Sequence, residues 1–275
     1  MSTVCPALEM EGDSHMPQVN GVSAAPASYR SLSARIPAGA PALPFHGEDV
    51  RAAEQYRLLR TNIVQHPLQP RLMAIGSASP GDGKTITAIN LAGTLALKHD
   101  LSVLLVDGDL RRSTVAQVLG IPAEPGLAEV LRGQVRLEEA IVRIEQAPNL
   151  YVLPSGDTDL NPTELLDSEA CSSTFASFRE RFSYVVVDTT PMTAVADFKL
   201  VSQLCDGTLV VVRPDHTNRN ALMRAIEVAP QITILGAILN DYPDWFLSRT
   251  EDYYGYYYGE SGSGVKSMSS GRGRK

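Results

Sequence analysis

The sequence has few cysteines, no long apolar run and no excess of positive charge. Its three cysteines, Cys5, Cys171 and Cys205, are far apart and show no CxxC spacing. This pattern is typical of reduced cysteines in a cytosolic protein rather than of a disulfide framework. No apolar run approaches the roughly 18 residues that a membrane-spanning helix needs. The N-terminus also lacks the basic and apolar regions of a secretory signal, so we expect any contact with a membrane to require a partner.

The charge balance argues against a nucleic-acid partner. Lysine and arginine number 24 against 31 aspartates and glutamates, which gives a net charge of −7. Proteins that bind nucleic acids usually carry a basic balance. Hydrophobic residues make up 44% of the 275 residues, which is enough for one large α/β domain or two small ones.

Composition divides the chain into three segments. Residues 1–46 are rich in Pro, Ala, Ser and Gly without sustained periodicity, and we predict a flexible N-terminal arm. Residues 47–243 have the patterning of a folded domain. Residues 244–275 are rich in Gly, Ser and Tyr with almost no aliphatic side chains, and we predict a flexible C-terminal tail.

Within the central segment, apolar strand patterns alternate with helical patterns. The predicted strands are 72–76, 102–107, 150–153, 184–188, 208–213 and 234–240, and the predicted helices are 48–65, 84–98, 162–182 and 218–228. Several strands are nearly continuous runs of Val, Leu and Ile, as expected when both faces of a parallel sheet are covered. The alternation predicts an α/β fold with a doubly wound, mostly parallel sheet.

A phosphate-binding motif joins the first predicted strand to the helix that follows it. Residues 78–85 fit the pattern [AG]xxxxGK[ST] in the strand–loop–helix context that it requires, which indicates the P-loop NTPase type of fold. Backbone N–H groups and the helix N-terminus hold phosphate oxygens in such loops. Lys84 would reach the β- and γ-phosphates and Thr85 would coordinate Mg²⁺. The predicted nucleotide contacts are Ser79, Pro80, Gly81, Asp82, Gly83, Lys84, Thr85 and Ile86. We therefore expect ATP and Mg²⁺ as ligands.

Three acidic residues end two of the apolar strands. Asp107 and Asp109 follow one strand, and Asp188 ends another. The carboxyl ends of parallel strands open on one crevice, so these carboxylates are expected to converge on the metal and the γ-phosphate. Each of them is otherwise compatible with a helix cap or a turn residue.

These motifs together resemble the bacterial tyrosine kinases of the polysaccharide-export type, which are P-loop autokinases. The resemblance covers roughly residues 52–240 and the tail. Its segments are Glu54-Gln-Tyr-Arg57-Leu-Leu-Arg60, Asp107-Gly-Asp109-Leu-Arg111-Arg112, Gly126-Leu-Ala-Glu-Val-Leu, Leu153-Pro-Ser-Gly, Asn161-Pro-Thr-Glu-Leu-Leu and Asp188-Thr-Thr-Pro191. Gly108, Ser113 and Thr190 depart from the usual Ala, Pro and Pro of the family, but none of them replaces a phosphate or metal ligand.

The resemblance implies specific roles for the site residues. Lys84, Asp107 and Asp109 would be catalytic, with Asp107 helping to deprotonate the incoming tyrosine. Thr85, Asp109 and Asp188 would hold Mg²⁺ directly or through water. Asn240 would contact adenine, although a strand-ending turn residue is an equally good interpretation. Arg111 and Arg112 could contact phosphate or phosphotyrosine, with a solvated arginine pair as the alternative.

The resemblance also implies an assembly and its partners. Glu54, Arg57 and Arg60 would form the interface of a ring-like homo-oligomer. The phosphoacceptors would be the tail tyrosines Tyr253, Tyr254, Tyr256, Tyr257 and Tyr258. The chain resembles the split members of the family, so we expect a separate transmembrane activator, the polysaccharide co-polymerase, and a cognate tyrosine phosphatase. This arrangement implies a cytoplasmic protein recruited to the inner face of the cell membrane, and an activity that regulates exopolysaccharide or capsule synthesis.

Two other functions are compatible with parts of the pattern. A positioning ATPase of the ParA or MinD type shares the fold and the strand-ending acids. Such proteins usually carry a further lysine at the position of Ser79 and lack a tail such as 253–258, so the kinase is favoured. An idle regulatory subunit is disfavoured by the intact Lys84, Thr85, Asp107 and Asp188. The histidines His46, His66, His99 and His216 show no metal-ligand spacing and are predicted to lie on the surface or in loops.

Overall fold

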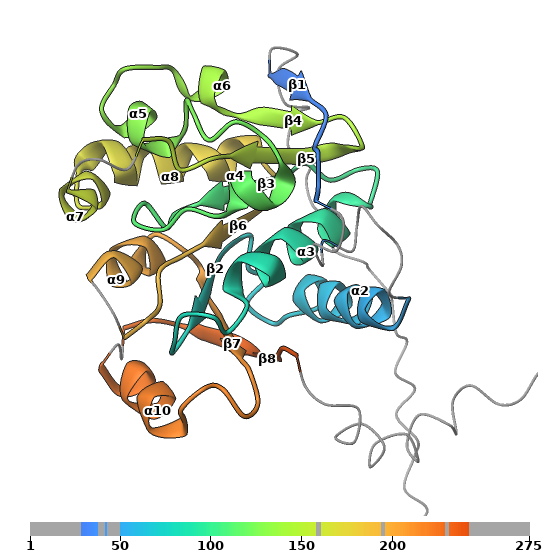
Figure 1. Ribbon diagram of the computed structural model, residues 1–275, viewed down its shortest axis with the longest axis vertical. Helices are drawn as coiled ribbons and strands as arrows, with labels where there is room; N and C mark the ends of the chain where they lie inside the picture. The colour runs from blue at the N-terminus through green and yellow to red at the C-terminus, as the bar shows by residue number, and fades with distance from the viewer. Residues whose placement is uncertain are drawn as a thin grey trace, which may run out of the picture.

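An eight-stranded sheet organises the part of the chain that the computed structural model describes, residues 29–37, 42, 50–157, 161–193, 196–228 and 231–241 (Figure 1). The strands are β1 (Arg30–Leu32), β2 (Leu72–Ser77), β3 (Val103–Asp107), β4 (Val142–Ile144), β5 (Ala147–Leu153), β6 (Tyr184–Asp188), β7 (Gly207–Val212) and β8 (Ile234–Leu239). The helices are α2 (Val50–Val64), α3 (Lys84–Ala96), α4 (Val115–Leu119), α5 (Leu127–Leu131), α6 (Leu137–Ala140), α7 (Pro162–Leu166), α8 (Glu169–Arg181), α9 (Ala196–Gln203) and α10 (Arg219–Val228).

The strands run in the order β1-β4-β5-β3-β6-β2-β7-β8. Neighbouring strands are parallel except β4 and β5, which are antiparallel. The predicted α/β class with a doubly wound, mostly parallel sheet is confirmed. Because β3, β6, β2 and β7 are neighbours, the segments that follow them meet at one end of the sheet, where ligands bind in such folds.

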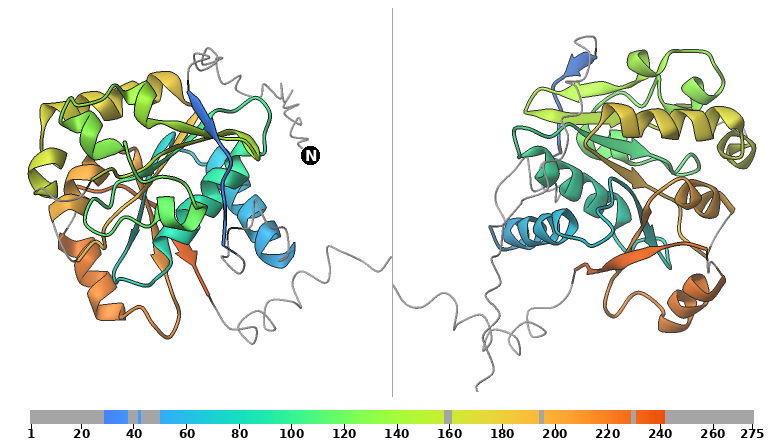
Figure 2. Two further views of the ribbon diagram at one scale, coloured as in Figure 1. Left: turned by 45° about the horizontal axis from the view of Figure 1, so that its top comes forward. Right: turned by 180° about the vertical axis from the view of Figure 1, so that it is seen from behind.

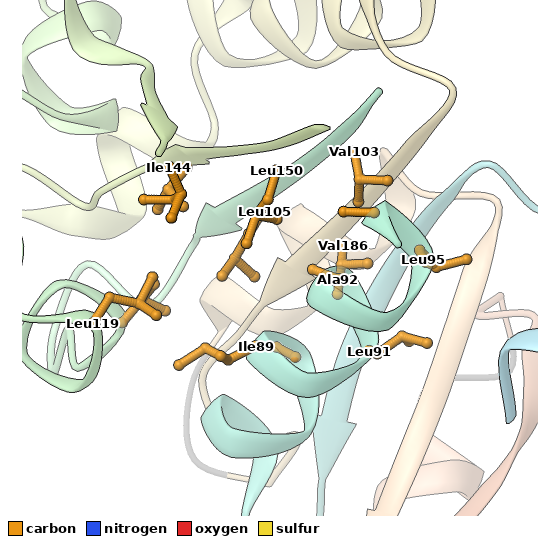
Figure 3. Packing of buried hydrophobic residues seen from close by; sticks show 14 of the residues in the cluster. Ile89, Leu91, Ala92, Leu95, Val103, Leu105, Leu119, Ile144, Leu150 and Val186 are labelled. Atoms are coloured by element: carbon orange, nitrogen blue, oxygen red, sulfur yellow. The ribbon is translucent and has the colours of Figure 1, made fainter. Parts of the chain in front are cut away.

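Apolar side chains fill both faces of the sheet. Along β3, Val103 and Leu105 belong to one buried cluster while Leu104 and Val106 belong to the other, as alternation along a strand requires. Helix α3 covers the first face, where Ile89 and Leu95 are labelled beside β3 and β6 (Figure 3). The aromatic residues of α8 and its end, Phe175, Phe178 and Phe182, belong to the second cluster. Figure 2 shows the helices on opposite sides of the sheet.

Two helical predictions differ in detail from the structure. The helix predicted over 162–182 is two helices, α7 and α8. Ser168 starts the second helix because its hydroxyl accepts a 3.2 Å hydrogen bond from the Cys171 N–H, which is a favourable N-cap. Helix α2 agrees closely with the predicted helix 48–65 and packs against α3. Among the described ranges, no helix is both long and apolar enough to cross a bilayer.

One part of the predicted N-terminal arm belongs to the sheet. Strand β1 pairs in parallel with β4, and the segment after it is held by a hydrogen bond from the Arg35 N–H to the Leu119 carbonyl. The prediction that residues 30–32 belong to a flexible arm is therefore wrong. The sequence pattern did not reveal this strand, because three residues are too few to show a period. The remainder of the predicted arm, apart from 29, 33–37 and 42, and the predicted tail 244–275 lie outside the described residues.

Candidate nucleotide and phosphoryl-transfer site

The predicted phosphate loop connects the end of β2 to the start of α3. Gly81 and Gly83 have φ values of +83° and +96°, in the left-handed region that favours glycine. A Cβ atom at Gly83 would also overlap the amide nitrogen of Asn240. Within the loop the Ser79 N–H donates to the Asp82 carboxylate at 2.9 Å, while Pro80 is exposed and Ile86 is half-buried in the first turn of α3. The loop thus has the curled backbone that the motif predicts.

Lys84 is the first residue of α3 and is largely buried. Its Nζ donates a 3.2 Å hydrogen bond to the Ser77 hydroxyl at the end of β2. Burial lowers the pKa of Lys84, and the charges of Asp188, Asp109 and Asp82 act in the opposite direction. A cation at the positive end of a helix attracts an anion strongly, so this position suits a phosphate group.

Thr85 and Asp188 meet at the carboxyl end of the sheet. The Thr85 hydroxyl donates a 2.6 Å hydrogen bond to Asp188, and it accepts one of 3.0 Å from the Thr114 hydroxyl. Burial raises the pKa of Asp188 to about 7, although the Thr85 hydrogen bond and the Lys84 charge lower it. An alcohol and a carboxylate are therefore held side by side, next to the phosphate loop.

Asp107 lies beside Asp188, because these two residues are paired in register on β3 and β6. Its carboxylate accepts hydrogen bonds from the Val115 and Asp109 N–H groups at 3.2 and 3.3 Å. Burial, followed by repulsion from Asp188, raises the pKa of Asp107 well above its ordinary value. Asp109 is half-buried, and its carboxylate accepts from the N–H groups of Arg111 and Arg112. The three predicted acids thus lie near one another, and their convergence on a metal and a γ-phosphate stays a prediction.

The donor set fits a metal ion bound together with phosphate. Mg²⁺ in nucleotide sites usually takes one or two protein ligands and completes its shell with phosphate oxygens and water. Thr85, Asp188 and Asp109 supply such oxygens. No group of three or more His, Cys, Asp or Glu side chains suited to a metal occurs among the residues that could be described. A metal held here would complete its shell with phosphate oxygens and water.

Arg111 has an ionic partner, which the sequence did not indicate. Its guanidinium donates to the buried Asp197 at 2.6 and 3.3 Å and to the Thr163 hydroxyl at 2.9 Å. Arg111 is nevertheless exposed to solvent, so its contact with a phosphate or phosphotyrosine stays a prediction beside the solvated alternative. Arg112 has an exposed side chain.

Residues after β7 and β8 reach the phosphate loop from the other side. Asn240, predicted to contact adenine, donates from Nδ2 to the Asp82 carbonyl at 3.0 Å. The Asp82 carboxylate is buried and contacts Thr217 Oγ1 at 2.8 Å and His216 Nδ1 at 2.9 Å. Sequence reasoning missed His216 and Thr217, because they lie 134 and 135 residues from Asp82 and belong to no motif.

The predicted interface residues lie on α2. Glu54 and Arg57 form an ion pair with both side chains exposed. Arg60 instead points toward α3, where it donates to the Thr94 carbonyl at 3.3 Å. The three residues therefore do not form one exposed face. The tail tyrosines 253–258 lie outside the described residues.

The comparisons with known proteins agree with this geometry. A family model described as an AAA domain matches residues 70–232. Tyrosine-protein kinase YwqD of Bacillus subtilis strain 168 is 35% identical over 209 residues, which cover 74% of this chain and 86% of that protein. The chain belongs to the family of bacterial tyrosine-protein kinases. Tyrosine-protein kinase ptk of Acinetobacter johnsonii is 34% identical over 205 residues, and this match spans 28% of that longer protein.

Solved structures separate this kinase family from the competing ATPase. The kinase domain of the Escherichia coli tyrosine kinase ETK superposes with a TM-score of 0.70 at 26% identity, covering 86% of this chain and 88% of that domain. The septum site-determining protein MinD of Pyrococcus horikoshii, complexed with Mg-ADP, reaches a TM-score of 0.53 at 28% identity, covering 62% of this chain and 70% of MinD. The positioning ATPase is thus the more distant neighbour, and the kinase prediction is favoured.

Proposed function

We propose that the protein is an ATP-dependent protein-tyrosine autokinase that regulates exopolysaccharide or capsule synthesis and export. The observation that carries this proposal is the arrangement of Lys84, Thr85, Asp107 and Asp188 around a phosphate loop at one end of the sheet. The combination provides a cation for the transferred phosphoryl group and carboxylates for a metal and a proton. Positioning and charge neutralisation of this kind account for most phosphoryl-transfer catalysis.

Each residue has a defined task in the proposed reaction. The phosphate loop and the N-terminus of α3 hold the triphosphate, and Lys84 contacts the β- and γ-phosphates. Bound Mg²⁺ supplies charge neutralisation, and Thr85, Asp109 and Asp188 would hold it. A tyrosine oxygen attacks the γ-phosphorus, the bond to the ADP oxygen breaks, and the phenolic proton passes to Asp107. A phenol with a pKa of about 10 needs such a base near neutral pH.

The tail supplies the acceptors in this proposal. Residues 253–258 contain five tyrosines and one glycine, and a tyrosine must leave its own core to enter a kinase site. Phosphorylation would occur between neighbouring subunits of a ring that forms through α2, and a cognate phosphatase would reset the tail. A separate transmembrane protein would recruit the kinase to the inner face of the membrane and stimulate it.

A phosphorylation assay tests the proposal. The purified full chain is incubated with ATP and Mg²⁺, with and without cytoplasmic segments of candidate membrane activators. Phosphotyrosine is then located by mass spectrometry. We expect weak phosphorylation of the tail alone and strong stimulation by one activator, with none in Lys84→Met. The absence of phosphotyrosine under every condition, in a protein that binds ATP, would reject the kinase assignment and favour a nucleotide switch.

A further inference from the structure

The interior of the phosphate loop contains the Asp82 carboxylate, whose hydrogen-bond partners are Ser79, His216 and Thr217. The Asp82 side chain is fully buried, although it lies between Gly81 and Gly83 on an otherwise accessible loop. One of its oxygens accepts from the Ser79 N–H at 2.9 Å, which closes the loop on itself. The other oxygen faces His216 and Thr217. This residue therefore links the phosphate loop to the segment between β7 and α10.

The charge state of Asp82 determines which group donates in each of its hydrogen bonds. Burial acts to raise the pKa of Asp82, but hydrogen bonds from His216, Thr217 and Ser79 outweigh it and hold that pKa below its ordinary value. Asp82 is then an ionised acceptor, so His216 donates through Nδ1–H and Thr217 donates through its hydroxyl. The Thr217 oxygen also accepts from the Arg213 N–H at 2.8 Å, which fixes the hydroxyl in its donating orientation.

His216 also packs against the phosphate loop. The ring of His216 lies against Gly81, because a Cβ atom added at Gly81 would be 3.4 Å from the ring carbon Cε1. Gly81 has a positive φ and, as a glycine, no side chain that restrains its backbone. The ring and the buried carboxylate therefore restrain the backbone between Ser79 and Gly83, which must have one shape to direct its N–H groups at phosphate.

We infer that His216 and Thr217 are positioning residues, which hold the phosphate loop in its nucleotide-receiving shape through the buried carboxylate of Asp82. This inference rests on the proposed function only in naming a nucleotide as the ligand. Neither residue needs to touch that ligand. A loop that already has its binding shape loses less conformational entropy when a phosphate group binds. Removing either donor should therefore weaken nucleotide binding.

Paired variants separate positioning from a general loss of fold. His216→Ala removes the donor, whereas His216→Asn places an amide N–H near the position of Nδ1. Thr217→Val and Thr217→Ser form a second pair, since serine keeps both hydrogen bonds. His66→Ala is the matched control, because the His66 side chain accepts a local hydrogen bond from the Leu68 N–H and lies outside the phosphate loop. We expect the Kd for Mg-ADP, measured by calorimetry, to rise about tenfold in His216→Ala and Thr217→Val. The Asn and Ser variants and the control should stay within about twofold of wild type.

Hydrogen exchange of the nucleotide-free protein tests the same inference without a ligand. Amides of the peptide 78–84 should exchange about tenfold faster in His216→Ala and at the wild-type rate in His216→Asn and His66→Ala. The inference is overturned if loop exchange and the Kd are both unchanged in His216→Ala and Thr217→Val. It is also overturned if His216→Asn loses as much as His216→Ala. A kinase assay without activity, combined with the expected exchange and Kd, would reject the proposed function and leave this inference standing.

Discussion

The Thr85 hydroxyl donates a 2.6 Å hydrogen bond to the Asp188 carboxylate, across 103 residues of sequence. The bond joins the first turn of α3 to the end of β6, so two motifs that are separate in the sequence form one site. Asp107 lies beside Asp188 in the register of β3 and β6. The phosphate loop, the proposed metal ligands and the proposed base therefore follow neighbouring parallel strands at the centre of the sheet.

Replacing Lys84 by methionine should abolish both nucleotide binding and phosphorylation. Methionine keeps much of the buried aliphatic stem but removes the charge that faces the phosphates. We expect the Kd for Mg-ATP to rise by about a hundredfold or more, since charge-assisted hydrogen bonds are lost. Calorimetry measures the affinity, and circular dichroism checks that the variant is folded. Wild-type phosphotyrosine content in this variant, purified without any other kinase, would contradict the assignment.

Replacing Asp107 by asparagine should affect catalysis far more than binding. The amide keeps the shape of the buried side chain but cannot take the phenolic proton. We expect the Kd for Mg-ATP within about threefold of wild type and a kcat lower by about 10²–10⁴-fold. Single-turnover phosphorylation at saturating ATP separates the two effects. An unchanged kcat would place the base elsewhere.

Helix α2 should be needed for assembly. Arg57→Ala combined with Arg60→Ala is expected to reduce the mass of the oligomer, as measured by light scattering. Arg60 also contacts α3, so the melting temperature of the double variant must be compared. Arg136→Ala is a suitable control, because Arg136 forms an exposed i,i+3 pair with Glu139 on α6 like that of α2. An unchanged mass would place the interface on another surface.

The tail tyrosines should account for most of the phosphotyrosine. Replacing all five by phenylalanine keeps the aromatic rings but removes the acceptor hydroxyls; the positions are Tyr253, Tyr254, Tyr256, Tyr257 and Tyr258. Phosphotyrosine measured by mass spectrometry should fall to the level of Lys84→Met, while the affinity for Mg-ATP stays unchanged. If phosphotyrosine stays at the wild-type level, the acceptors lie outside this cluster.

Phosphorylation of the tail should also loosen the ring. Each phosphate adds about −1.5 to −2 charges near neutral pH, and the chain already carries a net charge of −7. Repulsion should expel a phosphorylated tail from the neighbouring site. Light scattering in ATP and Mg²⁺ should therefore show a decrease of mass with time in wild type and a constant mass in the five-phenylalanine variant. A fully phosphorylated ring of constant mass would exclude this mechanism.

Asp206 should stabilise the domain in a pH-dependent way. Its carboxylate accepts from the Arg71 and Leu72 N–H groups and from Arg179. Burial acts to raise the pKa of Asp206, but the Leu72, Arg179 and Arg71 hydrogen bonds outweigh it and lower that pKa. Its contribution is therefore fully present above the ordinary Asp pKa and is lost as the pH falls through the lower folded-state value.

The corresponding variant is Asp206→Ala. We expect it to lower the free energy of unfolding by about 1–3 kcal/mol at pH 7, because two backbone donors and Arg179 lose their acceptor. Urea denaturation at pH 7 and near pH 3 measures the difference. The gap between variant and wild type should narrow at the acidic pH, and a gap that stays constant or widens would contradict this account.

Patterns within a single segment predicted every strand of the sheet except β1 and β4. The strands β2, β3, β6 and β7 are long apolar runs, so their sequence alone identifies them. Strands β1 and β4 have three residues each, too few for any period to be visible. The break between α7 and α8 depends on one Ser168 hydrogen bond, which competes with a continuous helical pattern.

Some residues of the site could likewise be predicted from the sequence and others could not. Lys84, Thr85, Asp107 and Asp188 belong to local motifs whose spacing predicts their chemistry. Arg111 pairs with Asp197 and Asp82 pairs with His216, across 86 and 134 residues of sequence. Asp197 and His216 belong to no motif. Such contacts depend on how the loops meet above the sheet, which local patterning does not specify.

Strand β1 has a practical consequence for work with this protein. It occupies the outer side of β4, whose N–H and C=O groups would otherwise be open to pairing with another molecule. Open strand edges of this kind promote association and aggregation. A shortened version that begins at residue 47, where composition suggests a domain boundary, would expose that edge. Expression designs and assays of oligomer size should therefore retain residues 29–37, or an artificial assembly could be mistaken for the ring.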